Sequence, residues 1–170
     1  MFKILHRDGN ARTGTLKTMH GSVQTPFFMP VATKATVKHI SVQDLESMKA
    51  KAIISNAFVL YLRPGHRHIE KLGGIHRFMN WKGVSFTDSG GFQMEKDVFL
   101  KKTTKDGICF KSPFDGREHF VTPEKDMQIQ MSIGSDVAMC LDSMPLIGHS
   151  KKAVEDAVVK TTMWALRCKV

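Results

Sequence analysis

Short apolar segments alternate with helix signals along this chain, and that alternation constrains the fold more than any other feature. The apolar segments cover residues 26–31, 52–58, 84–87 and 136–141, and a helix signal follows each of them, after an insertion in the third case. Strands that alternate with helices are typical of a parallel sheet covered by helices. The sequence therefore predicts an α/β fold of four strand–helix units.

Several predicted helices begin with recognisable caps. Ser41 and Asp44 have the spacing of a capping box, Thr122 precedes a proline at the first helical position, and Ser150 stands before the last helix. Apolar residues at helical spacing then identify the faces that we expect to be buried. These faces are Val42, Leu45 and Met48; Met127, Met131 and Ile133; and Val154, Ala157, Val158, Thr161 and Ala165.

Two antiparallel pieces are expected outside the strand–helix units. Residues 2–7 and 12–19 read as strands joined by an Asp-Gly turn, which is a hairpin signal. Residues 95–117 suggest a second, inserted hairpin that carries Lys101, Lys102, Lys105 and Lys111. These lysines either follow the phosphates of a nucleic acid or form an ordinary solvated surface.

The segment Phe86–Gln93 carries the strongest chemical signal. Asp88 follows a buried strand, where a carboxylate can exchange a proton, bind a cation or accept hydrogen bonds from a base. Gly90 and Gly91 permit a sharp turn and the close approach of a flat ligand. Phe92 offers a ring for stacking, and Gln93 offers a donor and an acceptor. The alternative is an ordinary turn, because Asp, Ser and Gly all favour turns.

Polar residues stand at the C-terminal ends of three predicted strands. They are Asn56, Asp88 and Asp142. In barrels of parallel strands this edge carries the active site, so we expect the three side chains to converge. For any one of them, helix capping or a turn is the alternative explanation.

Charge and cysteine content limit the classes of partner and compartment. The formal net charge is +9, which suits a polyanion such as nucleic acid but also fits a generally basic protein. Cys109, Cys140 and Cys168 have no metal-site spacing, and His66 with His68 reads as a solvated helix face. We expect reduced thiols in a cytoplasmic protein, and no apolar run is long enough to span a membrane.

A set of motifs in a fixed order resembles the tRNA-guanine transglycosylase, or queuine tRNA-ribosyltransferase, family. They are ARTG (11–14), TPFFMPV (25–31), TVK (36–38), LRPG (62–65), GGIH (73–76), FTDSGGFQ (86–93), SPFDG (112–116) and IGSD (133–136). The resemblance implies a TIM (β/α)8 barrel. Residues 1–170 are then expected to be a single partial catalytic domain, with roughly the first four βα units, an N-terminal β-hairpin and an inserted hairpin.

The resemblance also implies a reaction and roles for particular residues. Members of the family are pentosyltransferases that replace a guanine in tRNA with a 7-deazaguanine, queuine or its precursor, through a covalent ribosyl-enzyme intermediate. Asp88 matches the acid/base residue, and Asp142 matches a carboxylate that accepts from the N–H edge of the base. The base-binding loop corresponds to Asp88, Ser89, Gly90, Gly91 and Phe92, with Asn56 and Gln93 in support. The expected partners are tRNA, a deazaguanine base and, in a full-length protein, a second copy.

The chain differs from the family pattern at several places. Ala57 and Val59 stand where members mostly have Thr and His, and Ser143-Met144-Pro145 replaces the usual loop after Asp142. The nucleophilic aspartate and the Cys/Cys/Cys/His zinc site of the family lie in the later half of the barrel, and this chain has no ligands for that zinc. We therefore expect these residues alone to lack exchange activity.

Four other interpretations remain open. The chain is alternatively a non-catalytic tRNA-binding or dimerisation partner, or an inactive truncated remnant. An archaeosine-type transglycosylase is an alternative to the queuosine type. An unrelated barrel enzyme for a small metabolite survives only if the motifs are coincidental.

Overall fold

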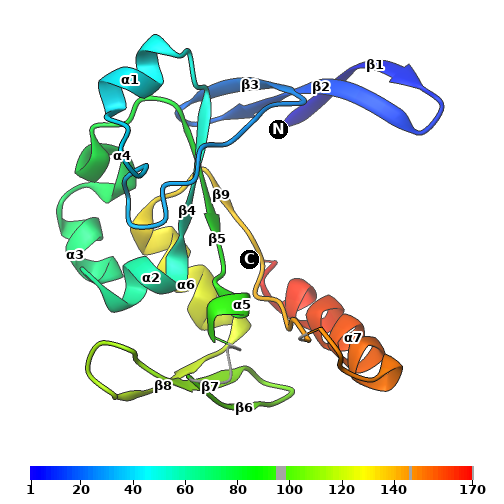
Figure 1. Cartoon of the computed structure of the whole chain (residues 1–170). Helices are drawn as coiled ribbons and strands as arrows, with labels where there is room; N and C mark the ends of the chain where they lie inside the picture. The colour runs from blue at the N-terminus through cyan, green and yellow to red at the C-terminus, as the bar shows by residue number, and fades with distance from the viewer. Residues whose placement is uncertain (95–98, 146, 170) are drawn as a thin grey trace.

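The fold is mixed α/β, and the computed structural model describes residues 1–94, 99–145 and 147–169 (Figure 1). At its centre lies a parallel sheet in the order β4-β5-β9. Its strands are β4 (Ala52–Asn56), β5 (Val84–Asp88) and β9 (Val137–Ala138). The parallel sheet and its helices confirm the α/β class, and the described residues form no closed barrel.

The register of β4 on β5 runs from Ala52 opposite Val84 to Asn56 opposite Asp88. Both strands therefore end at the same level, because parallel neighbours advance together. On the far side of β5, Phe86 pairs with Val137. The predicted fourth strand is shorter than expected, although the Met139 N–H still donates to the Thr87 carbonyl at 3.0 Å.

The first predicted strand, residues 26–31, is wrong as a strand buried on both faces. Only Val31 bridges to Ile54, although the Ala32 N–H donates to the Ile54 carbonyl at 2.7 Å. Phe28 is 81% exposed and Val31 62% exposed. This segment lies at the edge of the sheet, where one neighbour covers it and the other side is open.

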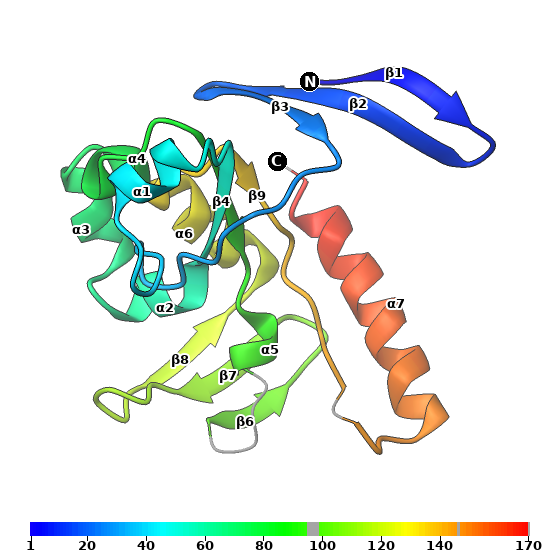
Figure 2. The same cartoon turned by 45° about the horizontal axis from the view of Figure 1, so that its top comes forward.

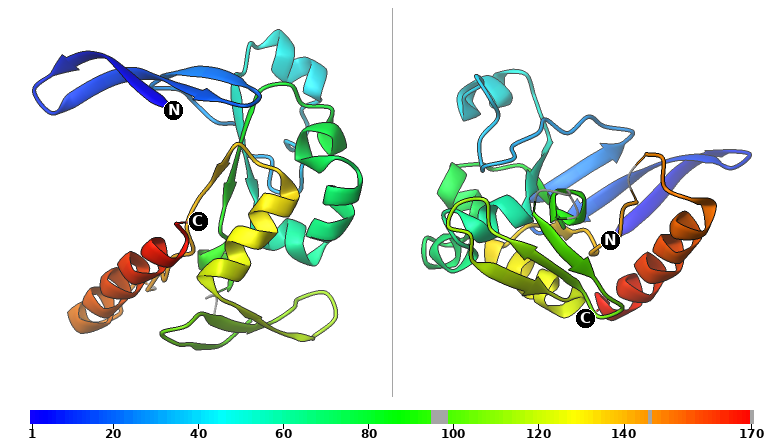
Figure 3. Two further views of the ribbon diagram at one scale, coloured as in Figure 1. Left: turned by 180° about the vertical axis from the view of Figure 1, so that it is seen from behind. Right: turned by 60° about the horizontal axis from the view of Figure 1, so that its bottom comes forward.

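One face of the parallel sheet is covered by helices α2 (Ala57–Leu62), α3 (His66–Lys71), α4 (Gly74–Met79) and α6 (Pro123–Ile133), as Figure 3 shows from behind. Their buried side chains meet Ile53 of β4 in one core. The helix α1 (Val42–Ser47) begins with the predicted capping box of Ser41 and Asp44. The predicted cap at Thr122 is also confirmed.

Helix α2 was not predicted, and the strand before it is two residues shorter than expected. Asn56 ends β4 and caps α2, with its side-chain oxygen accepting from the Val59 N–H at 2.8 Å. A continuous apolar run does not itself distinguish a strand from a buried helix. The helix forms here because Asn56 supplies a partner for an N–H group of the first turn.

Parts of the predicted buried faces are exposed. Met48 and Met131 are 59% and 67% exposed, whereas Leu45, Met127 and Ile133 are buried as predicted. On α7 (Lys151–Arg167), Ala157 is buried but Val154 and Val158 are exposed. Helix α7 touches the rest of the described molecule mainly through Trp164, which is fully buried among residues of α6 and the inserted sheet.

The N-terminal residues form a three-stranded antiparallel sheet of β1 (Phe2–Asp8), β2 (Ala11–Thr18) and β3 (Gly21–Thr25). The predicted hairpin is confirmed, and β3 extends it. Figure 2 shows this sheet reaching out beyond the first residues of the parallel strands. Val23 packs there against Ala52 and Val84, so the sheet covers the N-terminal end of the parallel strands.

A second antiparallel sheet lies at the opposite end of the parallel strands. It consists of β6 (Leu100–Thr103), β7 (Ile108–Lys111) and β8 (Glu118–Val121). The predicted inserted hairpin therefore exists with one further strand, while residues 95–98 of its expected range lie outside the described residues. Within the described part of the chain, no helix combines the length and apolar character needed to cross a membrane.

A buried polar network joins α6 to the parallel sheet. The Thr87 hydroxyl donates to Gln130 Oε1 at 2.6 Å, and Gln130 Nε2 donates to the Met139 carbonyl at 2.8 Å and to Asp126 Oδ2 at 2.7 Å. Asp126 is 1% exposed, and burial raises its pKa to about 8, with the charges of Asp142 and Asp88 acting in the same direction. Asp126 is therefore protonated at neutral pH.

The first prediction concerns Asp126→Asn. The folded protein holds the Asp126 proton up to about pH 8, whereas an unfolded chain releases it near pH 4, so the stability supplied by this group is lost as pH rises between these values. Asparagine keeps an oxygen acceptor for Gln130 and cannot ionise. We expect the free energy of unfolding of the variant, relative to wild type, to increase from pH 5 to pH 8 by up to about 1.4 kcal/mol per unit.

Urea unfolding at several pH values measures this difference. Asp8→Asn makes the same chemical change at the exposed end of β1 and serves as the control. Equal slopes for Asp126→Asn and wild type would show that Asp126 is already ionised in the folded protein.

Candidate active site

The ends of two parallel strands and one following loop meet at one place. Asn56 and Asp88 are the paired last residues of β4 and β5. The Ser89 hydroxyl, one residue further, donates to Asp142 Oδ1 at 2.9 Å. The structure thus brings together the three polar residues that the sequence placed at strand ends. Asp142 itself follows β9 by several residues instead of ending it.

Asp88 has an unsatisfied oxygen in this cluster. Its Oδ1 atom is buried and has no hydrogen-bond partner among the described residues. Burial raises the pKa of Asp88, and the nearby charge of Asp142 raises it further, against the opposing hydrogen bond from Asn56. Buried polar atoms are normally paired, so a carboxyl oxygen in this condition is suited to a donor from a ligand.

The two glycines form the backbone wall of the site. Gly90 has φ +75°, and a Cβ there would overlap with the side chain of Phe58. A Cβ at Gly91 would overlap with the carbonyl and carboxylate oxygens of Asp142. The Gly91 N–H donates to the Ser89 hydroxyl at 3.2 Å. Only glycine lets the chain pass between these protein neighbours, while the close approach of a flat ligand stays a prediction.

Asn56 and Gln93 connect the strand end to helix α5 (Gly91–Met94). Asn56 Nδ2 donates to Gln93 Oε1 at 3.0 Å, while its oxygen caps α2. Both polar atoms of the Asn56 amide are therefore engaged in positioning two helices. Phe92 lies on α5 with its side chain 41% exposed.

The residues after Asn56 contribute a backbone group, and no polar side chain at positions 57 and 59, to the surroundings of Asp88. Ala57 supports the Asp88 carboxyl only through a backbone hydrogen bond. The side chains of Ala57 and Val59 contain no polar atom. The departure from the resembled family at these two positions thus leaves fewer donors close to the carboxyl group.

Asp126 is the acidic residue near the site that sequence reasoning missed. The charges of Asp142 and Asp88 add to the effect of burial in raising the pKa of Asp126, so the three carboxyl groups are coupled. Asp126 and Gln130 lie four residues apart on α6, so they share one helix face. The signal that the sequence offered was this polar pair, with the apolar residues Met127 and Ile129 between its two members.

The cysteines do not form a metal centre. Of the described residues, the only cluster of three or more metal-ligating side chains is His20, His76 and Asp136, which has no thiol. Cys109, Cys140 and Cys168 are free. The cluster of His20, His76 and Asp136 differs in its donors from the Cys/Cys/Cys/His zinc site, which the family resemblance places in the later half of the barrel.

The second prediction concerns Ser89→Ala. The change removes the donor to Asp142 and the acceptor for the Gly91 N–H, both in a buried setting. We expect a loss of about 1–3 kcal/mol in the free energy of unfolding, since the partners lose their hydrogen bonds. Ser22→Ala in the exposed strand β3 is the control, expected to change stability by less than about 0.5 kcal/mol. Similar values for both variants in urea unfolding would contradict the geometry.

Comparisons with known proteins identify the relatives of this chain. A family described as queuine tRNA-ribosyltransferase matches residues 8–170. Proteins with that name from Halothermothrix orenii and Pelotomaculum thermopropionicum are each 46% identical over 170 residues, covering 99% of this chain and 46% of their own length. The namesake from Thermodesulfovibrio yellowstonii is 46% identical over 168 residues, covering 99% of this chain and 44% of its own.

The chain thus spans about half the length of the curated relatives that it matches. The match includes the strand ends, the glycine loop and Asp142 described above. Both the family model and the identity of the relatives lead to one assignment: the chain belongs to the queuine tRNA-ribosyltransferase family.

Proposed function

We propose that the protein replaces a guanine in tRNA with a 7-deazaguanine base, and that the residues of this chain form the base-binding part of the site. Family membership supports the reaction class. The single observation that supports the placement is the buried, unpartnered Oδ1 of Asp88 at the end of β5. A purine ring nitrogen that carries a proton is a fitting partner for that oxygen.

In this proposal Asp88 holds or releases the proton of the base. Because burial and Asp142 raise the pKa of Asp88, the group exchanges a proton more readily near neutral pH than an exposed aspartate does. Asp142 accepts hydrogen bonds from the N–H edge of the base. Its Oδ1 is already oriented by Ser89, so the carboxylate is held in place before the ligand arrives.

The loop after Asp88 supplies a surface for the flat ring. Gly90 and Gly91 are buried against Phe58 and Asp142 and form the turn that leads into α5, where the half-exposed Phe92 stacks on the base. A base in tRNA must leave its stack before it reaches such a pocket. By family resemblance, the carboxylate that attacks the ribose lies in the half of the relatives that this chain does not span.

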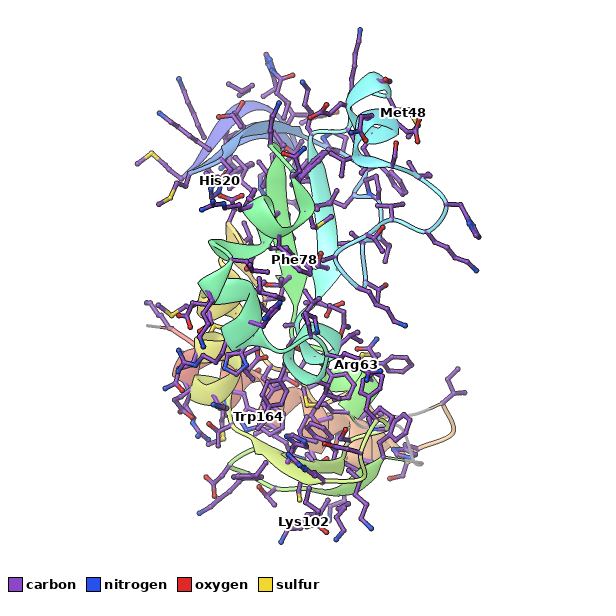
Figure 4. The ribbon with its side chains drawn as sticks, turned by 90° about the vertical axis from the view of Figure 1, so that its left-hand side faces the viewer. His20, Met48, Arg63, Phe78, Lys102 and Trp164 are labelled. Atoms are coloured by element: carbon purple, nitrogen blue, oxygen red, sulfur yellow. The ribbon has the colours of Figure 1, made fainter. Side chains whose placement is uncertain are left out.

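Basic residues near the site are suited to the tRNA backbone. Arg63, over the ring of Phe114 at 5.3 Å, and Lys102 of β6 lie toward the same end of the molecule as the inserted sheet (Figure 4). Lys101 pairs with Glu118, whereas Lys102 and Lys111 are exposed on the strands. Cations at such positions bind phosphates and release counterions.

The finer features of the family are part of the same proposal. We place the parallel sheet in a TIM barrel whose other strands lie outside this chain, and the zinc site among residues that this chain lacks. A homodimer in the cytoplasm, acting on tRNA, is the expected working form. The three parallel strands with helices on one face support the barrel.

A second candidate role is a non-catalytic binding partner of such an enzyme. The observation in its favour is the exposed apolar face of α7, where Val158, Val159, Met163 and Leu166 are 55–70% exposed. Exposed apolar patches of this kind often contact another protein. This role predicts tRNA or protein binding by the chain without affinity for a free base.

The third prediction tests the base site with Asp88→Asn. Calorimetric titration of the chain with 7-deazaguanine is expected to show binding by wild type and at least about tenfold weaker binding by the variant, since an amide places a donor near a base N–H where the carboxylate offers acceptors. Asp115→Asn, in the exposed loop after β7, is the matched control and should bind as wild type does.

Two outcomes would contradict the proposal. One is equal affinity of Asp88→Asn and wild type for the base. The other is the absence of base binding by the wild-type chain together with binding of tRNA, which would favour the non-catalytic role.

A further inference from the structure

We propose that His20, His76 and Asp136 form a binding site for a divalent transition-metal cation, at the end of the parallel sheet opposite the candidate active site. The three residues come from distant parts of the chain. His20 lies in the turn between β2 and β3, His76 lies in α4, and Asp136 directly precedes β9. Figure 4 shows His20 beside the N-terminal sheet, far from Lys102 at the opposite end.

The ligand atoms already lie close to one another. Nδ1 of His20 is 3.0 Å from Asp136 Oδ1, and Nε2 of His76 is 3.3 Å from Asp136 Oδ2. One ligand atom from each of the three residues lies within 4.8 Å of the others. Two ligands on a tetrahedral zinc ion, each bonded at about 2.0–2.1 Å, are separated by about 3.3 Å. A cation could therefore be bound after a small contraction of the cluster.

The chemistry of the donors selects the class of cation. Two imidazoles and one carboxylate are typical ligands for zinc and for similar transition metals, whereas calcium and magnesium prefer oxygen ligands. The two imidazole rings stack with their centroids 3.6 Å apart and an interplanar angle of 20°. Nδ1 of His20 and Nε2 of His76 contact the two different oxygens of the same carboxylate.

Backbone groups hold the ligands in place. Asp136 accepts hydrogen bonds from the Ser85 N–H at 3.0 Å and from the His20 N–H at 3.2 Å. Nε2 of His76 lies 3.0 Å from the Gly83 carbonyl, a contact that a cation bound to this nitrogen would replace, and Gly134 offers His76 another backbone hydrogen bond. Metal-binding carboxylates and imidazoles usually have such outer partners, which fix the orientation of the ligand atoms.

The site has an entry path for the ion and room for water. The three side chains border a cavity of about 890 Å³ that is also lined by Gly73, Gly74 and Ser135. The side chain of Asp136 is 1% exposed, while that of His20 is 39% exposed. The carboxylate thus forms the floor of the site, and His20 stands at its solvent side. Water from the cavity can complete the coordination of a cation with three protein ligands.

Metal binding would attach the N-terminal sheet to the parallel sheet. The contacts of His20 with Asp136 span 116 positions in the sequence. A bound ion adds coordinate bonds between these parts of the folded chain, and the unfolded chain cannot hold the three ligands together. The cation is therefore expected to stabilise the folded protein.

The experiment uses the whole chain, freed of metal with a chelator and titrated with zinc chloride in a calorimeter. We expect one zinc ion to bind per chain and the affinity to fall at least tenfold in His20→Ala, whose side chain lies in a partly exposed turn. The matched control replaces both His66 and His68 with alanine. That variant removes two other histidines and should bind zinc as wild type does.

A second measurement keeps the proposal testable if a variant changes the fold. Cobalt(II) added to wild type should give the visible absorption bands of a site with nitrogen and oxygen ligands, and zinc should raise the thermal midpoint of wild type but not of His20→Ala. The proposal is overturned if wild type binds no zinc, or if His20→Ala binds it as tightly as wild type. The cluster would then be a hydrogen-bonded contact without a metal.

Discussion

The register between β4 and β5 is the constraint on which the candidate site depends. Asn56 and Asp88 face each other only because Ala52 is paired with Val84 at the other end of the same ladder. A slip by one residue would turn Ile53 away from the helices that it packs against, so this packing fixes the register. Thr87 strengthens it, because its hydroxyl is held by Gln130 of α6.

The site brings several carboxyl groups together, and these groups differ in burial and in their hydrogen-bond partners. Asp126 is deeply buried and carries a proton at neutral pH, with its pKa raised to about 8. Asp88, at the strand end, is less buried, and hydrogen bonds from Asn56 and from the backbone partly offset the effect of burial on its pKa. Asp142 receives a hydrogen bond from Ser89. Adjacent carboxyl groups in unequal surroundings are suited to proton transfer.

Much of this arrangement could be predicted from local sequence signals. The capping box at Ser41, the helix start at Thr122 and the strand that ends at Asp88 all depend on neighbours within a few positions, and the structure confirms them. The other elements depend on contacts with residues that are distant in the sequence. Residues 26–31 resemble a buried strand in composition, yet only one side of the segment has a hydrogen-bonded neighbour.

The sequence predicted which residues lie at the site better than it predicted the contacts between them. The glycine loop and the polar strand ends were visible because each follows an apolar run. Asp126 was missed, because its spacing from Gln130 places the two on one helix face but does not show that this face is buried. Helix α7 carries more apolar side chains than the rest of the described molecule covers. Periodicity alone therefore predicted a wider buried face than the structure has, where Ala157 and Trp164 are the buried residues of the helix.

The packing of the glycine loop also limits how the site can change over evolutionary time. Neither Gly90 nor Gly91 has room for even a methyl group, because Phe58 and Asp142 occupy the space. Substitutions that alter ligand preference must therefore arise at neighbouring side chains such as Phe92 and Gln93, while the backbone between them stays fixed. If the proposed base site is correct, a mutational search for altered ligand preference should target α5 and leave the two glycines unchanged.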